Sequence, residues 1–550
     1  MLASIPNKTK YEWYYVYSCM GSGLEKDKTL DNMRKILYLS YGDLPSYLKP
    51  CLLYLSLFPE DSLIFRDDLV RLWVAEGFVD EKQGSNLSVI GDRYFNELVN
   101  RSMIKPELMN EYGVAGACRV HDMILDLIIS LSTQENFVTI PEGQHLKSTG
   151  CKIRRISLQS KQKTLQETDN MSSARSLIVL GDAVHGMPPL SIFSVLRVLY
   201  LNGGNRVIQP KDLGSLHHLR YLRLAGDLEP ELLEGIGNLK VLKTLDLRWT
   251  FIEELPACIV QLRQLERLLM DSRLKFPDGI GNLTSLQELS VLDVDKAPNT
   301  LAELGKLTEL QVLKIKGFKE NEGYKETFLQ ILPNLGNLRT LKFDDLIIEP
   351  RSLDSVSDQW KGPARLQVFD GNYINFSELP RWFSSLSELS CLSITVNVLR
   401  QIDLQLLGAL PVLRYLELHV HPEGTTEERL VIGSDHPFRS LTQFKFGHFS
   451  RCWLVFGLGV MPRVRTLNLY FRVRERVDGG FDVGLENLTS LKHVTVEVYC
   501  KGATTREVED AETKIRNAHG SHPNPPTLVQ ERHHELYMRV EPEQQSTFVC

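Results

Sequence analysis

The most regular alternation of hydrophobic and polar positions lies between residues 219 and 270. The segments LRYLRL, LKTLDL and LERLLM begin at Leu219, Leu242 and Leu265, so the pattern returns every 23 residues. In each copy the first, fourth and sixth positions are apolar and face inward from a short strand, while the positions between them face the other way. One copy cannot bury its own leucines, so the copies are expected to stack on each other.

Copies of this pattern extend along most of the chain. They are predicted to start at residues 153, 174, 196, 219, 242, 265, 286, 310, 338, 366, 389, 413, 441, 464 and 491. An L-x-x-L-x-L segment that recurs every 20–29 residues or so is the signature of leucine-rich repeats. Four of the intervals are 27–28 residues long. We expect their extra residues to bulge at the convex side or the edge of a curved solenoid.

The residues that precede the repeats follow a helical pattern instead. The predicted elements are helices over 30–44, 46–59, 67–79, 88–104 and 120–132, a β-hairpin over 105–118 and a strand over 136–140. Pro45 and Pro59 end the first two helices, and the acidic residues Asp67 and Asp68 are expected to cap the third. Helices followed by a small hairpin are typical of a winged-helix-like domain.

The predicted fold class is therefore α+β, with a small helical winged-helix-like domain followed by an irregular α/β leucine-rich-repeat solenoid, a horseshoe. Residues 1–24 are interpreted as the remnant of a preceding helical subdomain and a linker, 25–145 as the winged helix and 146–500 as the solenoid. Residues 501–550 are predicted to form a capping helix, with Val508, Ala511 and Ile515 on one face, and a disordered tail.

Composition narrows the class of protein. The chain has 550 residues, of which 43% are hydrophobic and 24% charged, as in folded proteins rather than disordered ones. Its formal net charge of −6 argues against a general nucleic-acid binder. No apolar run approaches the roughly 20 residues that span a bilayer, so no stable membrane insertion is expected. The nine cysteines are scattered and odd in number, which favours reduced thiols in the cytoplasm, with the nucleus as an alternative.

Three short motifs connect the helical region with a known family. CLLYLSLFPED occupies residues 51–61, LVRLWVAEGFV residues 69–79 and VHD residues 120–122. Together with the repeats, they make the chain resemble the C-terminal part of a plant intracellular nucleotide-binding leucine-rich-repeat disease-resistance protein, of the coiled-coil class common in cereals. Val120 stands where the family has the Met of its Met-His-Asp motif. The resemblance covers nearly the whole chain.

The resemblance implies a nucleotide sensor at His121 and Asp122. In the family, the matching His contacts the β-phosphate of bound ADP and holds the receptor off, and the Asp orients that loop. The residues alone permit another reading, in which Asp122 is the N-cap of the helix that follows. The sequence contains no G-x-x-x-x-G-K-[ST] loop for phosphates. We therefore expect no cofactor for this chain alone, although the intact family binds ADP or ATP. The sequence leaves two interpretations open, a naturally truncated receptor and a partial gene model of a longer one.

The outward positions of the repeat strands are the candidate partner-binding surface. Mixed charge together with Tyr and Arg suits protein contacts on a concave face, although each single residue can equally be a solvated one. The candidates are Tyr221, Arg223, Asp246, Arg248, Lys314, Lys316, Tyr415, Glu417 and Tyr470. Trp249 and Trp382 are either partner anchors or packed side chains.

The predicted function is recognition and autoregulation in plant innate immunity. As the resemblance implies, the repeats would bind a pathogen effector or a guarded host protein, and the winged helix would relay the nucleotide switch. Further partners are a receptor nucleotide-binding domain or another receptor in trans. No H-E-x-x-H or G-x-S-x-G motif is present, so no enzyme is expected. Acidic residues in 67–79 disfavour DNA binding by the winged helix.

Two alternatives stay open. One is a leucine-rich-repeat substrate adaptor of a ubiquitin ligase, which would need an F-box-like helical region within residues 46–79. The other is a non-functional truncated receptor or a decoy.

Overall fold

The structure is a computed structural model that describes most of the chain. The described residues are 29–80, 86–109, 114–140, 152–159, 169–228, 230–271, 274–317, 322–344, 362–421, 429–448, 453–473 and 483–539. The chain forms two compact units, Met1–Leu286 and Gln287–Cys550. The predicted remnant at 1–24 and the predicted domain boundary at 145 lie outside the described residues.

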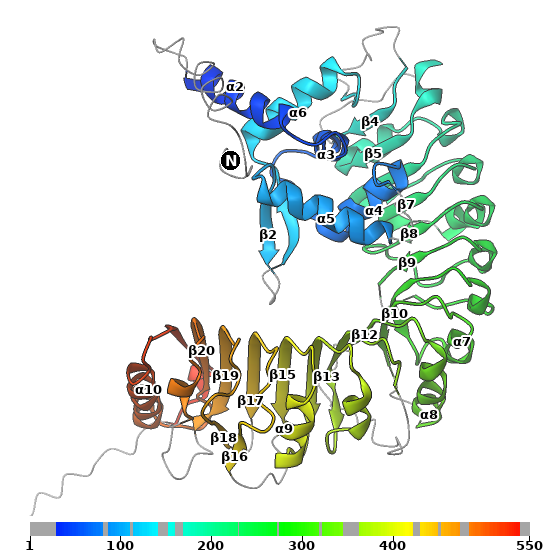
Figure 1. The fold of residues 1–550 in the computed structure, drawn as a ribbon. Helices are drawn as coiled ribbons and strands as arrows, with labels where there is room; N and C mark the ends of the chain where they lie inside the picture. Colours follow the sequence, from blue (N-terminus) through cyan, green and yellow to red (C-terminus); the bar gives the residue numbers. More distant parts are fainter. Residues whose placement is uncertain are drawn as a thin grey trace, which may run out of the picture. The chain divides into compact units, whose positions relative to one another are not determined.

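In the described part of the chain, the first unit begins with five α-helices and a small sheet (Figure 1). The helices are α2 (Thr29–Gly42), α3 (Leu48–Leu53), α4 (Arg66–Glu76), α5 (Leu87–Asn100) and α6 (Asp122–Gln134). The strands β1 (Ile64–Phe65), β2 (Lys105–Met109) and β3 (Ala115–Arg119) form an antiparallel sheet in the order β1–β3–β2. The predicted hairpin over 105–118 is therefore confirmed.

Local sequence signals account for several helix ends. Helix α4 ends at Gly77, whose φ of 83° is accessible to glycine without strain. At the start of α5, the side chain of Asn86 accepts a hydrogen bond from the backbone N–H of Ser88. The N-cap of α4 is Phe65 and no side chain caps this helix, so the expectation that Asp67 and Asp68 cap it is wrong.

Two further predictions in this region need correction. The expected single helix over 46–59 is split into α3 and a 3₁₀ helix at Tyr54–Leu57, because the chain tightens before it extends at Phe58. The expected strand over 136–140 is reduced to one bridge between Thr139 and Ile156.

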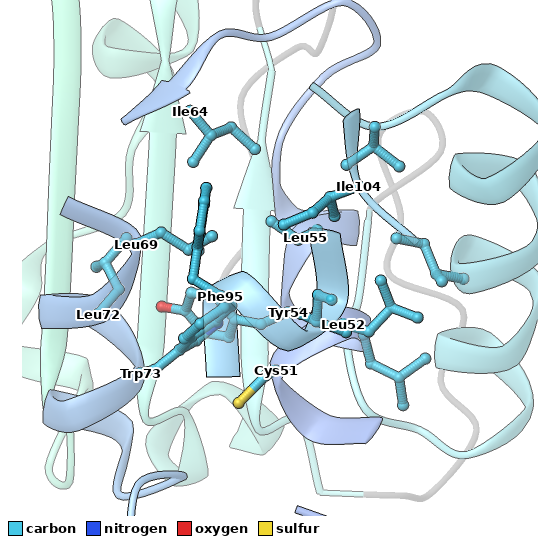
Figure 2. Packing of buried hydrophobic residues seen from close by; sticks show 14 of the residues in the cluster. Cys51, Leu52, Tyr54, Leu55, Ile64, Leu69, Leu72, Trp73, Phe95 and Ile104 are labelled. Carbon is cyan, nitrogen blue, oxygen red and sulfur yellow. The ribbon is translucent and has the colours of Figure 1, made fainter. Parts of the chain in front are cut away.

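An apolar core joins the helices to one another. Its largest fully buried side chains include Trp73, Tyr54 and Phe95. Figure 2 shows Trp73, Tyr54 and Phe95 together with Leu52, Leu55, Leu69 and Leu72. The same cluster continues into the repeats through Ile178, Val198 and Tyr221. The winged-helix region and the first repeats therefore share one hydrophobic core.

The repeats of the first unit form parallel strands that follow one another in chain order. The strands are β4 (Arg155–Leu158), β5 (Ser176–Leu180), β6 (Val198–Ile208), β7 (Tyr221–Leu228), β8 (Thr244–Asp246) and β9 (Arg267–Leu269). Each begins two residues after its predicted apolar start, and the leucines of the pattern are buried.

The second unit repeats this arrangement. Its parallel strands are β10 (Glu288–Asp293), β11 (Val312–Lys316), β12 (Thr340–Phe343), β13 (Val368–Phe376), β14 (Cys391–Val396), β15 (Tyr415–Val420), β17 (Gln443–His448), β19 (Thr466–Arg472), β20 (His493–Tyr499) and β21 (Thr527–His533). Between them lie α7 (Pro298–Leu304), α8 (Glu322–Ile331), α9 (Gln401–Gly408), α10 (Thr505–Gly520) and a two-stranded sheet of β16 (Arg429–Ile432) and β18 (Trp453–Phe456).

The end of the second unit both confirms and corrects the sequence analysis. Helix α10 begins with a capping box, in which Thr504 and Glu507 exchange hydrogen bonds with each other's backbone, and it buries Val508 and Ile515. The expected disordered tail is wrong for residues 527–533, because β21 pairs with β20 from Thr527 to His533. Residues 540–550 lie outside the described residues.

Candidate functional site

Helix α4 brings a carboxylate of the winged helix onto the face of the repeats. Asp68 accepts hydrogen bonds from Arg71 on its own helix, at 2.9 Å, and from Arg248 after β8, at 2.6 Å. Arg223 of β7 lies 3.9 Å from the other oxygen of Asp68. A single acidic side chain therefore joins residues separated by 180 positions in the chain.

Asp246, the last residue of β8, completes this ion cluster. Its carboxylate accepts hydrogen bonds from Arg248 at 2.9 and 2.7 Å and one from Arg223. The side chain of Asp246 is fully buried, and that of Arg223 is 8% exposed. The cluster thus holds three arginines and two aspartates in a mostly buried site, where ion pairs need near-complete hydrogen bonding to persist.

The charges of the cluster fix one another's protonation. Burial alone would raise the pKa of Asp246, but the hydrogen bond from Arg248 and the charges of Arg223 and Arg248 outweigh it, so the pKa of Asp246 lies below its usual value. Burial disfavours the charged form of Arg248, yet its hydrogen bond to Asp246 and the charge of Asp68 raise its pKa. Asp246 and Arg248 are therefore both ionised at neutral pH.

A second buried pair lies at the other end of α4. Glu76, whose side chain is fully buried, accepts hydrogen bonds from Arg155 of β4 at 2.9 and 3.1 Å. It also accepts one from Ser176 of β5, whose hydroxyl lies 3.4 Å from that of Tyr54. Each end of α4 is thus tied to a different pair of repeats.

Aromatic rings surround the second pair. The guanidinium of Arg155 lies 4.1 Å from the ring centre of Phe137 and 4.9 Å from that of Phe78. A cation placed over a desolvated ring gains up to about 2 kcal/mol. The rings therefore help to offset the cost of burying Arg155.

The apolar part of the contact contains two side chains with unused polar atoms. Trp73 on α4 and Tyr221 on β7 are both fully buried. Neither the indole N–H of Trp73 nor the hydroxyl of Tyr221 has a hydrogen-bond partner among the described residues. Burial also raises the pKa of Tyr221 well above its usual value. The contact thus buries two polar groups without hydrogen-bond partners among the described residues, which lowers its net stability.

This geometry corrects part of the predicted concave binding surface. Tyr221, Arg223 and Asp246 were expected to face a protein partner, but they are buried, at 0%, 6% and 0% exposure. Arg248 keeps 30% of its side chain exposed while it binds Asp68 and Asp246. The prediction of exposed side chains is wrong here because the winged helix covers this part of the sheet.

The remaining candidates belong to the second unit. Lys314, Lys316, Glu417 and Tyr470 are half-buried on its strands, with Lys316 at 3.4 Å from Asp293. Tyr415 is buried, contrary to expectation. The residues that bind partners stay a prediction, since the structure contains no partner.

The carboxylate of Glu417 is held by its own neighbours. Tyr415 donates to it at 2.7 Å, His419 lies at 3.1 Å and Ser393 at 3.3 Å. Burial alone would raise the pKa of Glu417, but the hydrogen bonds from His419 and Tyr415 lower it to about 2. The ammonium of Lys445 lies 5.7 Å from the ring centre of the buried Tyr415.

The two tryptophans have opposite environments. Trp382 is buried and stacks on Phe383, with ring centres 4.1 Å apart, so it is a packed side chain. Trp249 is 72% exposed.

His121 and Asp122 lie at the exposed start of α6. The N-cap is His121 rather than Asp122, because the Nδ1 atom of His121 accepts a hydrogen bond from the backbone N–H of Met123 at 3.3 Å. In a neutral ring Nε2 then carries the proton and is a free donor. Asp122 is the first residue of the helix. The arrangement fits one contact to a phosphate at a helix N-terminus.

Comparisons with known proteins match both parts of the chain. The family model for a leucine-rich repeat region matches residues 173–528, and that for the disease resistance protein winged helix domain matches residues 57–128. This chain belongs to the leucine-rich-repeat disease resistance proteins of plants. Its fold is dominated by the repeats, an architecture whose extended concave surface suits protein–protein contacts.

Curated relatives from two plants agree with this family. Disease resistance protein RGA5 from Oryza sativa subsp. japonica is 30% identical over 534 residues, which cover 93% of this chain and 47% of the relative. Disease resistance protein Pik-2 from the same plant is 29% identical over 75% of this chain and 45% of its own length. Probable disease resistance RPP8-like protein 4 from Arabidopsis thaliana is 28% identical, covering 88% and 54%. The chain spans about half the length of these relatives.

Sequence reasoning missed Asp68, Glu76 and Arg155, which carry the contact between the winged helix and the repeats. Asp68 and Glu76 are charged residues on a helix that is otherwise mostly buried, and that combination was an available signal because buried charges need partners.

No described helix has the length and apolar content to cross a membrane.

Proposed function

We propose that this chain is the recognition and autoregulatory part of a plant immune receptor. The observation that supports this function best is the buried ion cluster joining Asp68 to Arg223 and Arg248. Charges in such a cluster are stable either when all of them are paired or when all are hydrated, and intermediate arrangements are costly. The contact between winged helix and repeats is therefore suited to two discrete states, closed and open.

Recognition is assigned to the strand faces of the second unit. Lys316, Glu417 and Tyr470 keep partly exposed side chains there, and mixed charge with tyrosine suits a protein surface such as a pathogen effector or a guarded host protein. A partner that binds the open state better than the closed one would shift the population toward it. This proposal assigns no catalytic step to the chain.

We further infer a nucleotide sensor at His121. The free Nε2–H of this residue and the N-terminus of α6 would contact a phosphate of ADP in a receptor that contains a nucleotide-binding domain. Free cysteines at positions 51, 118, 258 and 500 suit a reducing compartment, so the proposed location is the cytoplasm or the nucleus. The match of residues 57–128 to a winged helix disfavours the ligase-adaptor alternative, whose F-box would need the same residues.

The test is a charge exchange within the cluster, made in the full-length gene product as the plant expresses it. Asp68→Arg places three arginines around a fourth and should release the winged helix, giving leaf cell death without a pathogen. Asp68→Arg combined with Arg248→Asp restores one opposite-charge pair and should return the leaf to quiescence. Amide hydrogen exchange at β7 and β8 reports release independently. The proposed autoregulation would be refuted if Asp68→Arg released the winged helix, as measured by amide exchange, without causing leaf cell death.

A further inference from the structure

The turn after β8 presents two aromatic side chains to solvent. Trp249 is 72% exposed and Phe251 is 61% exposed, while Thr250 and Ile252 are buried, at 8% and 4%. Trp249 and Phe251 are therefore two exposed aromatic side chains on either side of the buried Thr250.

Trp249 adopts a backbone conformation that bulky residues rarely take. Its φ is +70°, in the left-handed region where the Cβ of an L-residue crowds the following carbonyl group. Two hydrogen bonds hold the residue there. Its N–H donates to Asp271 Oδ2 at 2.7 Å, and its carbonyl accepts from the N–H of Gly226 at 2.9 Å. Backbone strain that surrounding contacts maintain occurs preferentially at functional positions.

Hydroxyl bonding inside the same turn adds to this rigidity. Thr250 Oγ1 donates to the carbonyl of Leu247 at 2.7 Å. Three hydrogen bonds thus hold the backbone of this turn, from which the indole extends into solvent. No ring or cation contacts that indole among the described residues. An aromatic group that is fixed, strained and without a partner does not contribute to the core.

Acidic side chains lie around the aromatic pair. Gly226 bridges to Thr250 in a parallel register, which places the exposed Asp227 beside Phe251. Glu253 and Glu254 follow directly and are exposed, and Asp271 lies beneath Trp249.

Among the described residues, two basic groups of this region are already engaged. Arg248 binds Asp68 and Asp246, and Arg206 binds Asp182 at 2.8 Å. Lys275 pairs with Glu254 through the backbone. Within this described part of the chain, carboxylates therefore outnumber basic groups that are not held in an ion pair.

We propose that Trp249 and Phe251 form a docking site for a protein segment that carries an arginine or lysine next to an apolar residue. Tryptophan is the strongest cation–π acceptor among the side chains. The carboxylates of Asp227 and Glu253 supply the complementary charge, and Phe251 covers the apolar neighbour of the bound cation. Arg248, the residue before Trp249, bridges to the winged helix, so the site adjoins the contact described above. The proposal does not depend on the proposed switch.

The probe is a displayed library of random 12-residue peptides, selected on the full chain and counter-selected on the Trp249→Asn/Phe251→Ser double variant. Asparagine tolerates a positive φ, so Trp249→Asn should unfold at a temperature equal to or above that of the wild type. A lower temperature would mean that Trp249 supports the fold. Tyr373→Asn is the matched control, because Tyr373 is an exposed aromatic residue, at 51%, in the second unit.

The expected result is enrichment of peptides with Arg or Lys beside an apolar residue. Their affinity should fall about fivefold to thirtyfold in Trp249→Asn, fall less in Asp227→Asn, and stay unchanged in Tyr373→Asn. Absence of enrichment, enrichment of acidic or purely apolar peptides, or equal binding to the double variant would each overturn the proposal. None of these outcomes bears on cell death in Asp68→Arg plants, so the two proposals can fail separately.

Discussion

Asp246 in the first unit and Glu417 in the second occupy the same position of the repeat but meet different environments. Both follow the fourth, apolar residue of their pattern, Leu245 and Leu416 respectively. Asp246 is fully buried in a cluster that includes Asp68 of the winged helix. Glu417 is 18% exposed, and its partners come from its own and neighbouring repeats. One face is covered by another part of the chain, whereas the other satisfies its charges locally.

The difference shows what a covering domain changes. On the covered face, removal of one charge leaves its partners in a mostly buried site, which is expensive. On the open face, water replaces a lost partner at a lower cost. A carboxylate at the same repeat position can therefore hold two domains together in one repeat and tune a surface in another.

The largest expected effect comes from neutralising each carboxylate in turn. Asp246→Asn should destabilise the first unit by about 3–5 kcal/mol, because Arg223 and Arg248 lose their buried counter-charge. Glu417→Gln should cost the second unit less, about 1–3 kcal/mol. Urea unfolding followed by amide exchange in each unit measures both. Equal losses of unfolding free energy in the two units would show that coverage by the winged helix does not determine the cost of removing a carboxylate.

A smaller effect is expected from the bond that crosses between winged helix and repeats. In a double-mutant cycle, Asp68→Asn and Arg248→Gln should show a coupling of about 1–3 kcal/mol, and Asp68→Asn should speed amide exchange in β7 and β8. The control is Asp92→Asn, which breaks the 2.7 Å pair with Arg66 inside the winged helix. Faster exchange in β7 and β8 for the control as well would remove the special role of Asp68.

Acidification should give the smallest effect and sharpen the same contrast. The pKa of Glu417 is about 2, below its usual value of 4.5. A lowered carboxyl pKa contributes stability that is present above the unfolded value and is lost as pH falls through the folded one. The stability difference between wild type and Glu417→Gln should therefore shrink between pH 4.5 and pH 2. A difference that does not change over this range would contradict the lowered pKa.

The sequence predicted the strands of the repeats because their signal is local. The spacing of the leucines in each strand determines which face is buried. In the long parallel array, β4 to β20 each begin two residues after the predicted start of their pattern. The strand β21 was missed because TLVQERH has no such spacing, and it exists only by pairing with β20. His121 was not expected as the N-cap, because histidine is an uncommon cap and its role depends on ring orientation.

The sequence by itself determined the family, the order of elements and the inward-facing residues, since these depend on periodicity and short motifs. Tertiary structure alone decided which outward positions stay exposed. Arg223 and Glu417 share the fifth position of the repeat pattern, yet the first is buried beside Asp68 of α4 while the second is half-buried on its own strand. Burial of an outward position depends on contacts between residues far apart in the chain, as between Asp68 and Arg248, and no local pattern encodes them.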